Sequence, residues 1–247
     1  MGLLGAIGMR DKSSTIPQRK SFPCSNGEAP VKSRKKVPTF PRLPRITEAE
    51  VAGWYQSGHF SFDWTSWHFP NWIELLKKYR TRKARVLEIG SWEGRSAIFF
   101  LNYLPRCSVV CIDTFKGGLE HREARGSSRF LRKVETRFDA NIGKFGGRVE
   151  KVKARSAQAL AKLGVEGRRF DLAYIDGSHL AADVYSDAVL TWPLIVHGGL
   201  MIFDDYLWDG SRGPLEVPKP GIDAFLRTIA GNYLTALNDY QIAIVKR

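Results

Sequence analysis

Four residues of this sequence stand where a long apolar run meets polar chemistry. The run FDLAYI ends at Asp176, three residues before His179, and the run GGLMIF ends at the pair Asp204 and Asp205. A buried carboxylate is costly unless it is paired, hydrogen-bonded or bound to a metal. These runs therefore predict either a site that holds a ligand or cation, or aspartates that cap helices and stay in solvent.

A second polar constellation follows an earlier apolar run, in the stretch VLEIGSWEGRS. Gly90 and Gly94 are spaced G-x-x-x-G, with Glu88 two residues before the first and Ser96 two after the second. Glycines between a strand and a helix let a ligand approach the backbone amides. The spacing differs from the dinucleotide and nucleotide-phosphate fingerprints, and the acidic residue suits a ligand with positive charge. The alternative is that both glycines serve only a tight turn.

The next apolar run ends at Asp113, 19 residues after Gly94. A carboxylate at the tip of the second strand commonly holds a ribose diol through two hydrogen bonds. The two motifs together are far more specific than either of them alone.

Apolar runs alternate with amphipathic segments from residue 46 onward. The predicted strands are 84–90, 108–115, 148–154, 170–176, 198–206, 233–239 and 240–247. The predicted helices are 46–56, 71–80, 94–104, 128–145, 156–164, 181–195 and 220–231. Apolar strands separated by helices imply a mostly parallel sheet covered on both faces, and ligands then bind beyond the carboxyl ends of the strands.

We therefore expect a doubly wound, Rossmann-like α/β fold with seven strands. A tight turn joins the last two strands, so the last one should be antiparallel to its neighbour. Residues 46–247 should form one domain, in which residues 46–80 are an N-terminal helical cover.

The pattern E-x-G-x-x-x-G-x-S followed by an acidic second strand end resembles the class I S-adenosylmethionine-dependent methyltransferases. The run from Phe170 to Tyr206 is similar to methyltransferase family 24, whose relatives include sugar O-methyltransferases of the macrocin type. It also parallels the catechol and caffeoyl-CoA O-methyltransferases. The resemblance covers roughly residues 60–247 and implies S-adenosylmethionine as the cofactor.

The resemblance also implies roles for individual residues. Gly90 and Gly94 would face the methionine part with the support of Glu88, Asp113 would bind the ribose, and Arg155 and Ser156 would lie near the adenine. The expected cofactor-binding residues are Glu88, Gly90, Ser91, Gly94, Ser96, Asp113, Arg155, Ser156 and Asp176.

Magnesium is the second group that the resemblance implies, with Asp176, Asp204 and Asp205 as its ligands. Three carboxylates at adjacent strand ends would repel one another without a cation, and an all-oxygen set favours Mg²⁺ over zinc. His179 stands where catechol-type enzymes have a lysine that removes the acceptor's proton. With Asp176 it is the expected catalytic residue, although a histidine that caps the next helix would look the same.

Two segments are candidates for the acceptor site. An aromatic run from His59 to Trp72 precedes the first strand, and a loop rich in Gly and Pro, WDGSRGPLEVPKPG, follows Asp205. Core packing explains much of the aromatic run equally well. The segment TFKGGLEHREARGSSR, which contains His121, is a further candidate for the rim.

The net charge of +13 is concentrated in the first part of the chain. Residues 1–45 hold ten Lys or Arg and two Asp or Glu, which leaves only +5 for residues 46–247. Their Ser-, Pro- and Lys-rich composition predicts a disordered basic tail. It could be a tether to an anionic partner, a cleaved targeting peptide, a solvated extension, or an over-long start assignment with Met9 as the true start.

The remaining composition favours a cytoplasmic protein. No stretch approaches the roughly 20 apolar residues of a membrane-spanning helix. Cys24, Cys107 and Cys111 give neither an even disulfide framework nor a C-x-x-C metal spacing.

The expected function is Mg²⁺-assisted O-methylation of a sugar or phenolic hydroxyl on a small molecule. An RNA methyltransferase that uses the basic tail is an alternative, although nucleic acid is not the expected partner. A non-catalytic cofactor-binding scaffold is another alternative. The sequence leaves open the acceptor's identity and whether the protein is a homo-oligomer.

Overall fold

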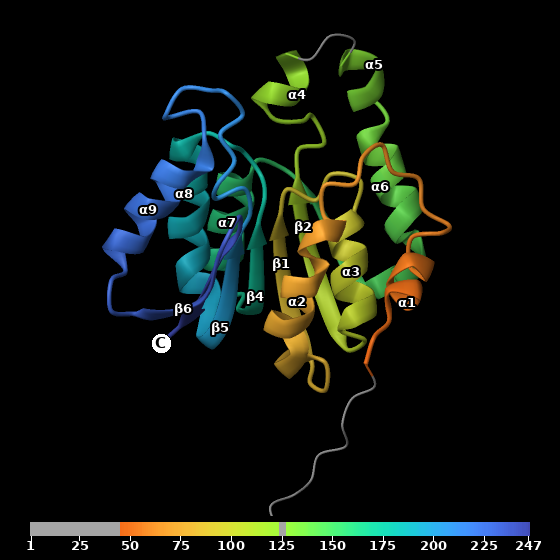
Figure 1. The fold of residues 1–247 in the computed structure, drawn as a ribbon, viewed down its shortest axis with the longest axis horizontal. Helices are drawn as coiled ribbons and strands as arrows, with labels where there is room; N and C mark the ends of the chain where they lie inside the picture. Colours follow the sequence, from red (N-terminus) through yellow and green to blue (C-terminus); the bar gives the residue numbers. More distant parts are fainter. Residues whose placement is uncertain (1–44, 124–126) are drawn as a thin grey trace, which may run out of the picture. The chain divides into compact units, whose positions relative to one another are not determined.

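The protein folds around one seven-stranded sheet (Figure 1), described by a computed structural model for residues 45–123 and 127–247. The strand order is β3-β2-β1-β4-β5-β7-β6. The strands are β1 (Ala84–Ile89), β2 (Cys107–Asp113), β3 (Val149–Lys153), β4 (Phe170–Ile175), β5 (Ile195–Phe203), β6 (Tyr233–Asn238) and β7 (Ile242–Lys246). The pairs from β3 to β5 are parallel, and β7 is antiparallel to both β5 and β6. The predicted doubly wound fold with an antiparallel last strand is confirmed.

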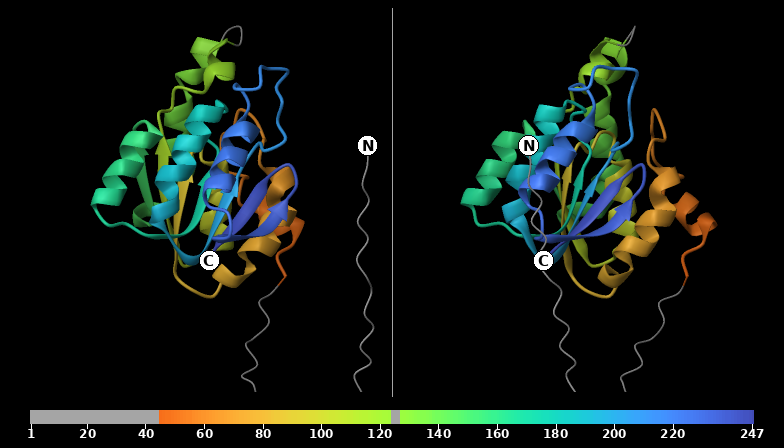
Figure 2. Two further views of the ribbon diagram at one scale, coloured as in Figure 1. Left: turned by 90° about the vertical axis from the view of Figure 1, so that its left-hand side faces the viewer. Right: turned by 60° about the vertical axis from the view of Figure 1, so that its left-hand side comes forward.

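The helices lie on both faces of the sheet. They are α1 (Glu48–Gly53), α2 (Phe69–Leu76), α3 (Arg95–Tyr103), α4 (Leu119–Glu123), α5 (Ser127–Leu131), α6 (Val134–Ile142), α7 (Ser156–Val165), α8 (Ala181–Thr191) and α9 (Pro218–Thr228). Figures 1 and 2 show α7, α8 and α9 on one face, and α2, α3 and α6 on the other. None of the helices in the described ranges is long and apolar enough to cross a membrane.

Each face of the sheet has its own apolar core. Alternation along β1 sends Val86 to one face and Leu87 to the other. Trp72 of α2 and Phe99 of α3 are completely buried in the first core. The free cysteine Cys111 is also buried there, as expected for a small core side chain.

The register of the central strands fixes where their ends lie. Ile89 pairs with Ile112 on one side and with Ile175 on the other, and Ile175 pairs with Phe203. The ends of β1, β2, β4 and β5 therefore lie at one level, at the same edge of the sheet. The residues that follow directly at this edge are Gly90, Asp113, Asp176 and Asp204.

Residues 46–80 contain the expected helices but are not entirely helical. Thr47 and Glu50 form a reciprocal capping box at the start of α1. Trp72 anchors α2, because its indole N–H donates to the buried Gln241 side chain at 2.8 Å. The predicted tail, residues 1–44, lies outside the described residues, and the proposed domain boundaries stay a prediction.

One helix was expected over residues 128–145, but the structure has α5 and α6 with a break between them. Val134 and Phe138 are completely buried beneath α3, whereas Phe130 contacts the rings of Trp92 and Phe62. Because of the break, Phe130 does not lie on the same helix face as Val134 and Phe138. The short helix α4, in the segment expected to form a rim, was not predicted.

Candidate active site

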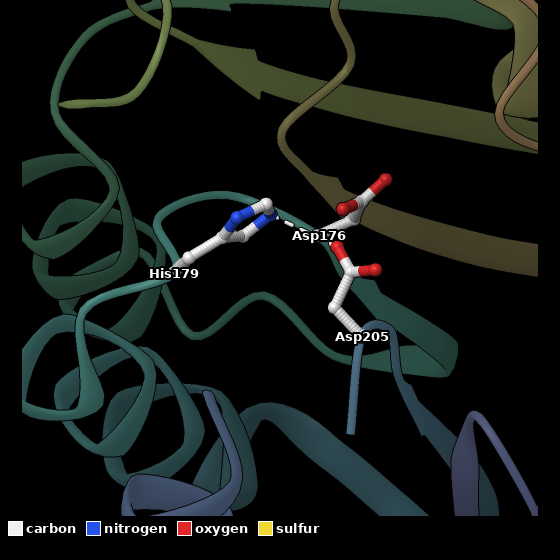
Figure 3. Close-up of side chains that lie close together, drawn as sticks. All are labelled: Asp176, His179 and Asp205. Carbon is white, nitrogen blue, oxygen red and sulfur yellow. Dashed lines mark ion pairs between the residues drawn. The ribbon is translucent and has the colours of Figure 1, made fainter. Parts of the chain in front are cut away.

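Asp176, His179 and Asp205 meet at the carboxyl edge of the sheet (Figure 3). Asp176 follows β4, His179 lies in the loop before α8, and Asp205 lies two residues after β5. One ligand atom from each lies within 4.8 Å of the other two. The His179 Nε2 atom is 2.9 Å from Asp205 Oδ2. Two carboxylates and an imidazole at this separation form a donor set that fits a divalent cation.

Asp204 is directed into the protein and is 7% exposed. Its Oδ1 atom is 3.2 Å from His68 Nε2 and accepts a hydrogen bond from Gln241 Nε2 at 3.0 Å. Burial opposes its ionisation, but the hydrogen bond and charge of His68, with the bonds from Tyr174 and Gln241, lower the pKa of Asp204. Asp204 is therefore the carboxylate that the interior holds ionised.

The hydroxyl group of Tyr174 lies between two carboxylates. It makes a short hydrogen bond with Asp204 and is 3.0 Å from Asp176 Oδ2. The hydroxyl group is the donor toward both carboxylates, so it ties Asp176 and Asp204 together through one oxygen atom. Burial and the charges of Asp204 and Asp205 raise the pKa of Asp176 well above its ordinary value, although the hydrogen bond from Tyr174 opposes this shift.

The backbone separates the side chains of the neighbouring pair Asp204 and Asp205. Asp205 has φ 54°, a left-handed conformation that aspartate tolerates better than most residues. Its amide N–H donates to Asp204 Oδ1 at 2.8 Å, and Tyr240 donates to Asp205 Oδ1 at 2.9 Å. The Asp205 Oδ2 atom is thereby left for His179.

The imidazole of His179 faces the site and does not cap the next helix. Leu180 occupies the N-cap position of α8, and its amide N–H donates to Ser178 Oγ. Burial would lower the pKa of His179, but the hydrogen bond and charge of Asp205 outweigh it and raise that pKa. The His179 Nδ1 atom has no hydrogen-bond partner in the described parts of the chain and lies 3.9 Å from Glu120 Oε1.

The neighbouring strand β1 carries a buried carboxylate, Glu88, that lacks hydrogen-bond partners in the part of the chain that the structure describes. It is completely buried, and among the described residues neither of its carboxylate oxygens makes a hydrogen bond of ordinary geometry. Burial raises the pKa of Glu88, and the nearby Ser91, Ser96 and Cys111 side chains offset this only in part. Ser91 and Ser96 are themselves buried. An unpaired buried carboxylate at this edge fits a cationic ligand such as the ammonium group of S-adenosylmethionine.

Gly90 and Gly94 are both required by the backbone. Gly90 has φ +85°, and an added Cβ would lie 1.8 Å from the carbonyl oxygen of Asp176. Gly94 has φ +82°, and an added Cβ would lie 2.8 Å from a methyl group of Ile142. These contacts account for both glycines by packing, so the glycines alone do not indicate a ligand.

Asp113 is placed between the loops after β1 and β2. Its carboxylate accepts hydrogen bonds from the amides of Trp92 at 2.7 Å and Phe115 at 2.6 Å. Burial raises the pKa of Asp113, although these amide hydrogen bonds lower it in part. Farther along the edge, Arg155 is the N-cap residue of α7, and Ser156 begins that helix.

The side chains that hold Asp204 and Asp205 in place were not predicted from the sequence. His68, Tyr174, Tyr240 and Gln241 act on Asp204 or Asp205 from distant parts of the chain. One signal was present, because Tyr174 brings a hydroxyl group into an otherwise apolar strand directly before Asp176. Such a hydroxyl group needs a buried partner.

Known proteins resemble this chain in sequence. Residues 87–206 match a family described as a methyltransferase domain, methyltransferase family 24. The mycinamicin VI 2''-O-methyltransferase of Micromonospora griseorubida is 25% identical over 179 residues, which cover 68% of this chain and 39% of that protein. The L-olivosyl-oleandolide 3-O-methyltransferase of Streptomyces antibioticus is 23% identical over 175 residues, which cover 67% and 40%. The chain thus spans about two fifths of the length of these curated relatives.

A solved structure shows the same fold. It is a methyltransferase from the mycinamycin biosynthetic pathway, in complex with Mg, SAH and mycinamycin VI. Its TM-score is 0.53 at 20% identity, with 75% of this chain and 50% of that chain covered. The strand order and this likeness show the Rossmann-like fold of the class I S-adenosylmethionine-dependent enzymes, and residues 87–206 carry the match to methyltransferase family 24.

Proposed function

We propose that this protein transfers a methyl group from S-adenosylmethionine to a hydroxyl group of a small molecule, with the help of a divalent cation. One observation carries the proposal. The Asp176, His179 and Asp205 group lies at the same strand edge as Glu88, whose buried carboxylate has no hydrogen bond of ordinary geometry among the described residues. Such an edge would accommodate a cationic cofactor and a metal side by side, which supports the proposal.

The cofactor would lie along the ends of β1, β2 and β3. Glu88, with Ser91 and Ser96 beside it, would bind the methionine ammonium group, and Asp113 would accept hydrogen bonds from the ribose hydroxyls. Two carboxylates near a sulfonium ion also stabilise its positive charge. Arg155 and Ser156 would border the adenine.

The cation would lie at Asp176 and Asp205. Asp204 would supply the third carboxylate of the expected set, or His179 would take this place through Nε2. When bound, such a cation lowers the pKa of the acceptor hydroxyl and orients its oxygen. The protein holds the donor atoms ready, because Tyr240 fixes one oxygen of Asp205 and Tyr174 fixes Asp176.

Where Asp204 completes the metal set, His179 would be free to remove the acceptor's proton. Its Nε2 atom faces Asp205, which orients the ring and stabilises the imidazolium that forms. Methyl transfer is an in-line displacement with little covalent work for the protein. Correct placement of the two reactants contributes about 7–11 kcal/mol in well-oriented systems.

A sugar hydroxyl is the acceptor that the relatives favour over a phenol. One curated relative is named for 2''-O-methylation of mycinamicin VI, and the other for 3-O-methylation of L-olivosyl-oleandolide. A phenolic acceptor and an RNA acceptor are not supported by any contact among the described residues.

Calorimetric titration of S-adenosylmethionine separates the two parts of the proposal. Asp113→Ala should weaken cofactor binding. Asp205→Ala should leave cofactor binding intact and abolish turnover. EDTA should also abolish turnover of the wild-type protein, because it removes the cation. Asp139→Ala is a matched control, because this aspartate makes only an exposed pair with Lys151. Absence of cofactor binding by the folded wild-type protein would refute the proposal, and equal cofactor loss in both variants would refute the division of roles.

A further inference from the structure

The imidazole ring of His179 is supported at one nitrogen and on its face, but not at the other nitrogen. Its Nε2 atom is 2.9 Å from Asp205 Oδ2, and the ring of Trp208 packs against it with 4.4 Å between the centroids. The Nδ1 atom is closed off from solvent and has no hydrogen-bond partner among the described residues. A buried ring nitrogen that neither the protein nor water satisfies is costly, so it indicates a contact that is still to be made.

Glu120 is the group that faces this nitrogen. It belongs to α4, which Figure 1 shows beyond the carboxyl ends of the strands. Its Oε1 atom is 3.9 Å from His179 Nδ1, and in the described parts of the chain this oxygen too is buried without a hydrogen bond of ordinary geometry. A donor nitrogen and an acceptor oxygen, both unsatisfied, thus lie opposite each other. A movement of about 1 Å would bring them to hydrogen-bond distance.

Glu120 faces His179 as a charged carboxylate. Burial would raise the pKa of Glu120, but the close contact with His121 and the charge of His179 outweigh it and lower this pKa to about 2. The Nδ1 atom of His121 is 2.6 Å from the same oxygen, Oε1. A carboxylate oxygen can accept from two donors, so the contact with His121 leaves an acceptor site for His179.

A second contact joins α4 to the other segment that covers His179. Arg212 Nη2 donates to Glu123 Oε2 at 2.6 Å. Arg212 lies in the loop after β5, which also carries Trp208. Exposed ion pairs of this kind contribute little to stability. The pair connects the two segments on the side of the site from which Glu120 approaches the imidazole.

We propose that Glu120 is a positioning residue, which accepts a hydrogen bond from the Nδ1–H group of His179 and keeps the Nε2 atom directed into the site. The inference rests on the proposed function and adds a residue to it. Tyr240 already occupies Asp205 Oδ1, so a cation at Asp205 would take the Oδ2 atom that now faces Nε2. The ring would then depend on Glu120 for its orientation.

This support is needed in both roles that the proposed function leaves to His179. Removal of the acceptor's proton requires a lone pair at Nε2, and so does binding of the cation. A hydrogen bond at Nδ1 fixes the tautomer in which Nε2 carries that lone pair. Histidine ligands of metal ions commonly donate their other ring N–H to a carboxylate for the same reason.

NMR of the full chain with isotope-labelled histidine tests this placement without an acceptor. Spectra would be recorded with SAH and Mg²⁺, and the signals that His179→Asn removes are those of His179. The wild-type protein should show His179 protonated at Nδ1, with this proton at low field. Glu120→Ala should lose the low-field proton. Glu120→Gln should retain it at higher field, because a neutral oxygen accepts a weaker hydrogen bond than a carboxylate.

Glu74→Ala is the matched control, because Glu74 is an exposed glutamate of α2 that pairs with Lys77. A low-field proton that persists in Glu120→Ala would overturn the inference, as would a wild-type His179 that is not protonated at Nδ1. A change confined to the His121 signals would assign Glu120 to His121 and overturn it as well. Calorimetry should give the same SAH affinity for all these proteins, which shows that each is folded. Failure of the wild-type protein to bind SAH would refute the proposed function instead.

Discussion

Among single residues, Glu88 has a free-energy cost that no contact within the described residues balances. Its carboxylate is completely buried, lacks hydrogen bonds of ordinary geometry among the described residues, and has a raised pKa caused first by burial. A group that destabilises the free protein and has no packing role is typical of a binding site. Binding of a cationic ligand, as proposed above, would offset this cost.

Glu88→Gln should therefore affect stability and binding in opposite directions. The amide removes a buried charge, so the free protein should melt at a higher temperature. Affinity for S-adenosylmethionine should fall about 10- to 100-fold, because a charge-assisted hydrogen bond is lost. Thermal unfolding with and without SAH measures both effects. Unchanged affinity in the variant would show that Glu88 does not contact the cofactor.

Asp187 on α8 gives a pH-dependent prediction at the same scale. It is 2% exposed, and burial, partly opposed by Ser156, raises the pKa of Asp187 to about 6. Between pH of about 4 and 6 the native state binds more protons than the unfolded state. The contribution of Asp187 to unfolding free energy therefore falls as pH rises through this window, and the penalty is complete above about pH 6.

Asp187→Asn should stabilise the protein by about 1–3 kcal/mol at pH 8 and by much less at pH 4. Denaturant unfolding of both proteins across this range measures the difference. A stabilisation that does not change with pH would contradict the conclusion that burial of the Asp187 carboxyl group raises its pKa. Asp139→Asn, in an exposed ion pair, is the control.

Where elements meet, the β1–α3 turn must pass very close to the end of β4. The Gly90 amide donates to the Ile112 carbonyl at 2.9 Å, which continues the β1–β2 pairing beyond β1. Its missing side chain leaves room for the Asp176 carbonyl. The positions of Asp176 and Gly90 are thus coupled through the backbone.

Gly90→Ala should reduce unfolding free energy by more than about 2 kcal/mol, because left-handed strain adds to a backbone overlap that no side chain can relieve. Gly94→Ala has the same strain, but its Cβ would meet a methyl group of Ile142 that can shift, so the loss should be smaller. Denaturant unfolding of both variants checks the order. The reverse order would show that the Gly90 turn relaxes easily.

The sequence predicted the elements better than the contacts between them. All seven strands followed from apolar runs that alternate with helical segments. The carboxyl-edge position of Asp113 and Asp176 followed from runs that stop at these two residues, because parallel strands end together. The break between α5 and α6 and the short α4 could not be predicted, since local helical periodicity continues through the break. The partners of Asp204 come from residues 68 and 241, and no spacing rule connects positions so distant along the chain.

For the whole molecule, the distribution of charge separates the first 44 residues from the methyltransferase domain. Those residues hold nine Lys or Arg and two Asp or Glu, which is more than half of the net charge of +13. This composition predicts a basic tail, which lies outside the described residues. The catalytic proposal therefore assigns them no part in cofactor or acceptor binding.

Deletion of residues 1–44 should leave the melting temperature and the affinity for SAH unchanged within error. Any affinity for RNA should fall with the deletion, because binding through phosphates depends on the number of cations and declines steeply with salt. Titration of SAH and of an RNA homopolymer at two salt concentrations into both proteins measures this. The RNA alternative would be favoured if the full-length protein bound RNA with a steep dependence on salt and methylated it, and if the deletion removed both activities. Loss of SAH affinity on deletion would instead extend the cofactor site into the first 44 residues.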